Sequence, residues 1–182
     1  MESKEKNTKE KILEEALKLF AQSGYMGTSM NDIASKLGVT KAALYKHYKS
    51  KQEILDSIIE KMNELDIERV KLYEMPEGDL EKVTAEYKET AFDKIKRFTK
   101  VQFLHWTEEE FSSCFRKMLT LEQYREPQMA QLYQNYLASG PLTYMEALFS
   151  GMLGAEGKAR QTALDFYGPI FLLYSIYDGA ED

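Results

Sequence analysis

Lysine is concentrated in one short stretch of the sequence, residues 36–51, which carries five lysines. Residues 1–51 contain ten lysines, no arginine and six acidic residues, a net charge of +4, which leaves −10 for the rest of a chain whose total is −6. Lysine ammonium groups bind nucleic-acid phosphates and displace counterions whatever the base sequence. The charge distribution therefore predicts a nucleic-acid contact near the N-terminus, although the total charge alone argues against one.

Residues at the spacing of a helix-turn-helix lie in the same region. Ala34 supplies a small side chain where two helices cross closely, and Gly38, four residues on, accepts the positive φ of a tight turn. The apolar residues expected to lock the crossing are Ile33, Leu37, Val39 and Leu44. The second helix of such a motif projects its polar face into the major groove of DNA.

Apolar periodicity and capping residues predict helices along the whole chain, and hence an all-α fold. In the N-terminal part we expect a helix from Thr8 to Gly24, a short helix after Ser29 and another from Lys41 to about Tyr48. A long helix is expected from the capping box at Ser50 to about Tyr73. Further helices are expected at roughly 79–107, 109–124, 127–138, 141–154 and 159–178. The predicted domains are 1–51, which binds DNA, 52–74, a connecting helix, and 75–182, which binds a ligand and dimerises.

The segment TSMNDIASKLGVTKAALYKHYKSKQEIL, residues 28–55, resembles the DNA-binding signature of the tetracycline-repressor (TetR) family of transcription regulators. The similarity covers residues 8 to about 60 and departs from the usual pattern at Ala42, often Gly, and at Tyr48, usually Phe. It implies an N-terminal three-helix helix-turn-helix domain, joined by a long helix to a helical ligand-sensing and dimerisation domain.

The resemblance also implies roles for individual residues. Lys51, near a helix N-terminus, would pair with a phosphate, Lys41 would contact a guanine, and Ala43 would touch a thymine methyl. For Tyr45 two alternatives stay open, a contact in the groove and an anchor in the core. The DNA-binding candidates are Thr28, Thr40, Lys41, Ala42, Ala43, Tyr45, Lys46, His47, Tyr48 and Lys51, of which Thr28, His47 and Tyr48 would also contact phosphates.

Aromatic residues are concentrated in the C-terminal part, where residues 87–182 hold 17 of the 22 in the chain. The segment Ile95–Trp106 is apolar nearly all round from Phe98 on, which predicts a central, buried helix. An aromatic-lined cavity with a few polar groups is the usual form of a small-molecule site, and the resemblance implies an inducer in this domain. The candidates are Phe103, His105, Trp106, Cys114, Met118, Tyr133 and Tyr136; the alternative is that each simply fills the core.

The last two predicted helices carry apolar residues on more faces than one small domain can bury. Pairing both helices with those of a second copy would give an isologous four-helix interface. The candidate interface residues are Tyr144, Leu148, Met152, Phe166, Ile170, Leu173, Tyr174 and Tyr177. Pro169 is expected to kink the last helix.

Other function classes lack the residues that they need. No catalytic triad, phosphate-binding glycine loop or HExxH motif is present, so we expect no enzyme, no cofactor and no metal site. The polar N-terminus and the single cysteine favour a cytoplasmic protein that does not enter a membrane. The sequence predicts a repressor that binds a palindromic operator as a homodimer and releases it on binding a small molecule. The alternative is a helical protein-interaction module without sequence-specific DNA binding.

Overall fold

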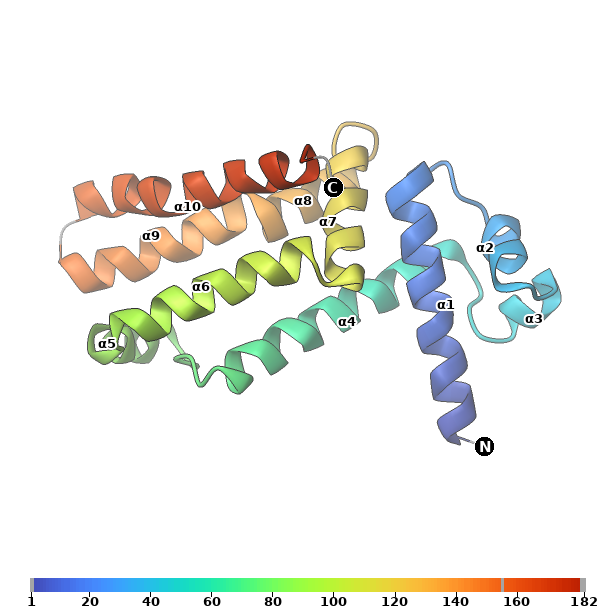
Figure 1. The fold of residues 1–182 in the computed structure, drawn as a ribbon, viewed down its shortest axis with the longest axis horizontal. Coiled ribbons are helices and arrows are strands. Elements are labelled where there is room, and N and C mark those ends of the chain that lie inside the picture. The colour runs from blue at the N-terminus through green and yellow to red at the C-terminus, as the bar shows by residue number, and fades with distance from the viewer. Residues whose placement is uncertain (1, 155, 181–182) are drawn as a thin grey trace.

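We describe residues 2–154 and 156–180 of a computed structural model of the chain; within them the chain forms helices and no strand, which confirms the all-α prediction. The N-terminal helices are α1 (Glu2–Ser23), α2 (Met30–Leu37), α3 (Lys41–Tyr45) and α4 (Lys51–Leu72). The others are α5 (Leu80–Glu89), α6 (Phe92–Thr107), α7 (Glu110–Glu122), α8 (Pro127–Leu137), α9 (Ser139–Leu153) and α10 (Glu156–Asp178). In Figure 1, α1–α3 form one end of the molecule and α4 runs from them along α6, while α9 and α10 lie side by side.

The helix-turn-helix forms as predicted, because each turn is closed by local hydrogen bonds. Ser29 caps α2 in a reciprocal capping box with Asp32, and the N–H of Val39 donates to the carbonyl of Ala34 at 3.0 Å. Gly38 ends α2 with φ +67°, a left-handed conformation that is less favourable for residues with a side chain than for glycine. Val39 does not lock the crossing as expected, because it is 43% exposed. The helix after Thr40 also ends at Tyr45, earlier than the predicted Tyr48.

The long predicted helix is confirmed as α4, one unbroken helix of 22 residues. Its N-cap is Ser50, whose hydroxyl accepts from the N–H of Glu53 at 3.1 Å. The Glu53 carboxylate accepts from the N–H of Lys49 rather than from that of Ser50, so the capping box is shifted by one residue. Since α4 begins beside α1 and leads through a short loop to α5, it connects the two ends of the molecule (Figure 1).

Two predicted boundaries in the C-terminal part are wrong. The expected helix over 79–107 is divided into α5 and α6 at Thr90, whose hydroxyl donates to the carbonyl of Glu86 at 2.8 Å and so competes with the helical hydrogen bond. The helix expected from Pro141 begins at Ser139, because proline in a first turn gives up an N–H that would have no helical partner. The α10 helix continues through Pro169.

The hydrophobic core continues without a break from the N-terminal helices into the nearer C-terminal helices. A single cluster joins side chains of α1 and α4, such as Leu17 and Ile58, to Phe115 and Leu119 of α7. The α6 helix is less central than predicted, because in the protomer only its last turn is buried. Within the part of the chain described, no helix combines the length and the apolar composition that crossing a membrane requires.

Replacing Gly38 with alanine tests whether the turn depends on its left-handed conformation. A Cβ at Gly38 would have no atom within 4 Å, so any cost arises from the backbone alone. We expect Gly38→Ala to lower the free energy of unfolding by roughly 1–2 kcal/mol. The control is Gly157→Ala in α10, where a Cβ also has open space and φ is not positive; there we expect a gain of about 0.5–1 kcal/mol or no change. Equal effects in urea denaturation would contradict this account of the turn.

Candidate nucleic-acid interface and sensor core

The outer face of α3 presents basic and polar side chains to solvent. Thr40 caps the helix, with its hydroxyl accepting from the N–H of Ala43 at 3.2 Å, and Lys41, Ala42 and Lys46 are exposed. Tyr45 is 42% exposed and its ring lies under the Lys41 ammonium group, 5.7 Å from it. The alternative in which Tyr45 anchors the core is therefore wrong. Ala43 is half-buried, and Leu44 holds α3 in the core.

Two residues that were predicted to contact phosphates have side chains that face the interior instead. Thr28 is 3% exposed, and its hydroxyl donates to the carbonyl of Gly24 at 2.8 Å. Tyr48 is 4% exposed; burial raises the pKa of its hydroxyl, and a hydrogen bond with Ser57 opposes that shift. Their polar groups are already used in closing the turn after α1 and in packing against α4. Both side chains thus support the fold behind the exposed face.

Lys51, also expected to pair with a phosphate, points into the turn between α1 and α2. Its ammonium group donates to the carbonyls of Tyr25 and Thr28, the second at 2.8 Å, and lies 4.2 Å from the centre of the Tyr25 ring. Burial lowers the pKa of Lys51, and the nearby Glu122 carboxylate opposes that shift. In this position Lys51 ties the first turn of α4 to the α1–α2 turn; a phosphate contact remains a prediction.

His47 lies at a shallow hollow between α1 and α3. The hollow has a volume of about 180 Å³, and Lys11, Val39 and Ala43 also line it. The Nδ1 atom of His47 is buried and, among the described residues, has no hydrogen-bond partner. This nitrogen is thus covered by protein and does not face solvent beside α3.

Contacts of α1 and α4 with α7 hold this basic end against the rest of the molecule. Lys18 of α1 pairs with Glu110 at 3.1 Å, and the Lys61 ammonium group lies 4.6 Å from the centre of the Phe111 ring. Glu122 of α7 is fully buried beside Gly24, so closely that a Cβ on Gly24 would lie 2.0 Å from its Oε1 atom. Sequence reasoning missed Glu122, although an acid three residues after Leu119 on an apolar face is a recognisable signal.

The predicted ligand residues are packed into the core. Trp106 and Met118 belong to the buried cluster, and Phe103, Cys114, Tyr133 and Tyr136 pack against it. None of the five cavities described is lined by any of these six residues or by His105. In the described structure these side chains fill space, which favours the core alternative for them.

His105 belongs to a buried polar network that sequence reasoning missed. It is fully buried, and the Arg69 guanidinium of α4 lies against its ring, 2.9 Å from Nε2. Its Nδ1 atom lies 2.7 Å from a Glu109 carboxylate oxygen. Arg69 also pairs with Asp66 at 2.8 Å, so α4, α6 and α7 meet at this network.

Arg69 gave no sequence signal, because its partners Gln102 and His105 lie more than thirty residues further along the chain.

Some of the candidate dimer residues are covered within the protomer. Leu148 and Tyr174 are buried, and the Tyr174 ring stacks on that of Phe103 at 5.5 Å between centroids. The prediction that these two residues lie in a dimer interface is therefore wrong. Met152 and Ile170 are half-buried. Exposed apolar side chains on α10 include Leu164, Phe166, Phe171, Leu172, Leu173, Ile176 and Tyr177.

Comparison with known proteins identifies the first part of the chain. Residues 12–58 match the family described as "Bacterial regulatory proteins, tetR family". Among curated proteins, the biofilm operon icaADBC HTH-type negative transcriptional regulator IcaR of Staphylococcus epidermidis is 42% identical over 52 residues, 29% of this chain and 28% of that protein. The IcaR of Staphylococcus aureus strain Newman is 41% identical over 51 residues. The chain thus matches less than a third of the length of these relatives.

Two solved structures share the fold over most of their length. A TetR/AcrR-family transcriptional regulator of Thermobifida fusca is 19% identical with a TM-score of 0.53, covering 97% of this chain and 88% of that one. The apo form of AibR is 20% identical with a TM-score of 0.52, covering 92% of this chain and 86% of that one. Over most of its length the chain therefore shares the fold of these two proteins.

Two neighbouring lysines separate structural from surface roles. Lys51→Ala removes an ammonium group from two turn carbonyls, so we expect it to lower the free energy of unfolding by about 1–3 kcal/mol. Lys49→Ala removes the same charge from an exposed position, and a change below about 0.5 kcal/mol is expected. If urea denaturation gives both variants the same stability, the inward role of Lys51 is wrong.

The pH dependence of stability tests the buried network. Burial lowers the pKa of His105 below its ordinary value of 6.5, with a hydrogen bond to Glu109 opposing the shift, so the unfolded chain takes up a proton near pH 6 that the folded chain does not. We therefore expect stability to fall as the pH is lowered from about 7.5 to 5.5. The fall should be smaller in His105→Gln, which retains His47 and the same acids. If the melting temperatures of the two proteins fall equally between about pH 7.5 and 5.5, His105 is not neutral in the folded chain.

Proposed function

We propose that this chain, a member of the tetR family of bacterial regulatory proteins, represses transcription by binding an operator as a homodimer and leaves it on binding a small molecule. The observation that carries the proposal is the outer face of α3, where the side chains of Lys41, Tyr45 and Lys46 are exposed to solvent. The names of the IcaR relatives support repression rather than activation.

In the proposed complex, α3 enters the major groove. Lys41 reads a guanine and Ala43 meets a thymine methyl. Lys36, Lys46 and Lys49, all exposed, neutralise phosphates on either side. His47, half-buried beside this face, is a further candidate for a phosphate contact. The buried Thr28 and Tyr48 act only by holding the turn and α4 behind this face.

A dimer follows from the apolar surface of α10. Leu172 and Ile176 are 59% and 57% exposed, one turn apart on the same helix. With the neighbouring exposed side chains they form an apolar surface of the kind that a second copy covers. Such a twofold dimer would bind a palindromic operator with half-sites about one helical turn apart or somewhat more.

Ligand response is proposed to act through α4. A helix of 22 residues is about 33 Å long, so a small tilt at its Arg69 end moves its Lys51 end appreciably. A ligand shifts this equilibrium only if it binds the geometry that does not fit DNA more tightly. Operator DNA must then weaken ligand binding by the same factor.

Binding to fluorescent duplexes at several salt concentrations tests the proposed DNA contact. The affinity for any duplex should fall steeply with salt, and Lys49→Ala should lower the slope by about 1. Lys41→Ala should instead relax the preference at one base pair of each half-site, at a cost of about 1–3 kcal/mol there. Lys88→Ala, an exposed lysine on α5, is the control. A protein-interaction module without a DNA-binding surface would show no such dependence of duplex affinity on salt.

Sedimentation of a charged variant tests the dimer. The double variant Leu172→Glu with Ile176→Glu places four carboxylates in the proposed interface, and we expect a monomer at micromolar concentration where the wild type is dimeric. Gln161→Glu, an exposed change elsewhere on α10, should leave the dimer intact. A monomeric wild type, or a dimer that survives the double substitution, would contradict the proposed interface.

A further inference from the structure

A groove lies between α4, α5 and α9, at the end of α4 remote from α3. Its volume is about 550 Å³, and its walls are mainly apolar, with Ile67, Val70, Leu80, Val83 and Ala147 among the lining residues. Ile67 and Leu80, on facing elements, are 52% and 46% exposed, so the apolar walls are open to solvent within the protomer. A cavity of this size and lining suits an apolar body of drug-like dimensions.

The charged side chains that line the groove are all acidic. Asp66 and Glu77 line it, and no lysine or arginine is among the lining residues. Lys82, whose side chain lies beside Gly78 at the rim, has an acid of its own, since it pairs with Glu86 at 3.6 Å. Arg69 offsets the charge of Asp66, but Glu109 stands beside Arg69 at 4.0 Å, so an excess of negative charge remains.

An aromatic ring completes the groove. Tyr144, which the sequence pattern suggested for the dimer interface, lines the groove from α9, and burial raises the pKa of its hydroxyl. Tyr144 is 49% exposed in the protomer, and a neutral aromatic ring can bind a positive charge on its face. Close packing of α5 on α9 supports this wall, since a Cβ on Gly151 would lie 2.7 Å from the Thr84 methyl group.

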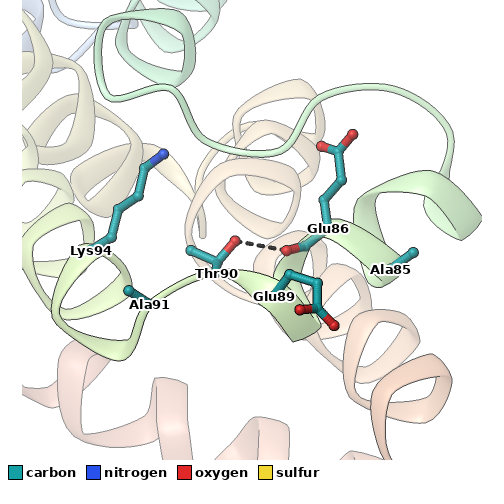
Figure 2. A pocket seen from close by; sticks show the side chains of 6 residues that line it. All are labelled: Ala85, Glu86, Glu89, Thr90, Ala91 and Lys94. Carbon is teal, nitrogen blue, oxygen red and sulfur yellow. Dashed lines mark hydrogen bonds between the residues drawn. The ribbon is translucent and has the colours of Figure 1, made fainter.

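A hollow of similar size at the α5–α6 junction lacks these properties. Its volume is about 530 Å³ and it is lined in part by Glu86, Glu89 and Lys94. Figure 2 shows that the two carboxylates point in opposite directions, and that the Thr90 hydroxyl is taken by the Glu86 carbonyl. No set of polar groups converges there on a ligand.

We propose that the α4–α5–α9 groove binds an apolar organic cation, whose charge is held between Asp66, Glu77 and the ring of Tyr144. This deepens the proposed ligand response and rests on it for its biological meaning. The cation competes with Arg69 for the Asp66 carboxylate. Because Arg69 also holds His105, occupancy of the groove is transmitted to the network that joins α4 to α6 and α7.

Calorimetric titration of the full chain without DNA tests the site, with tetraphenylphosphonium as probe and tetraphenylborate, of the same shape and opposite charge, as control. We expect saturable 1:1 binding of the phosphonium and none of the borate at the same concentration. Glu77→Gln should weaken phosphonium binding about threefold and Asp66→Asn about tenfold. Glu81→Gln, an exposed change on α5 outside the groove, should have no effect.

A second variant separates loss of charge from loss of fold. Thr143→Trp keeps both carboxylates but fills the groove from an exposed position on α9, so it should abolish phosphonium binding while leaving the melting temperature unchanged. Equal binding of both probes, binding unchanged in the Asp66 and Glu77 variants, or no saturable binding would overturn the proposal. These outcomes leave DNA binding untouched, whereas failure of the duplex experiment leaves the cation site standing.

The sole tryptophan reports on transmission. The Trp106 ring lies 5.2 Å from that of His105 and does not line the groove. Phosphonium binding should change Trp106 emission in the wild type and much less in Asp66→Asn at matched occupancy. The same change in both proteins would show that Asp66 does not carry the signal.

Discussion

The structure depends on one helix that is held by polar contacts at both of its ends, half-buried at its start and buried near its end. At the start of α4, Lys51 donates to the carbonyls of the α1–α2 turn; near its end, Arg69 is enclosed by Asp66 and His105. Breaking either contact would leave charged or polar groups buried without partners, which is costly. The helix-turn-helix and the C-terminal helices are therefore both tied to α4, and a movement of one must be accommodated by the other.

The same constraint explains why the residues proposed to contact DNA divide into two groups. Lys41, Tyr45 and Lys46 are exposed because α3 touches the core only on the side that carries Leu44. Thr28 and Tyr48, close by in sequence, are buried where that core meets α1 and α4. The exposed group provides contacts with a partner, and the buried group sets the position of α3.

The sequence predicted the turns and caps that depend on neighbouring residues. It did not predict burial and contacts that depend on residues far apart in the chain. Ser29, Gly38 and Ser50 act within a turn, so the helix-turn-helix and the start of α4 were predictable. The burial of Thr28 depends on the packing of whole helices, and His105 meets Arg69 from 36 residues away. Composition likewise could not separate core aromatics such as Trp106 from a groove lined by Ile67 and Tyr144, because both are apolar segments at helical spacing.

The central claim is that the exposed face of α3 reads DNA in a symmetric complex. The most direct measurement is selection of bound duplexes from a random library by the full chain, followed by sequencing. The account predicts enrichment of an inverted repeat whose half-sites are spaced by about one helical turn or somewhat more, and loss of one preferred base pair per half-site in Lys41→Ala. Enrichment of no sequence, or of a single asymmetric site that Lys41→Ala reads equally well, would contradict it.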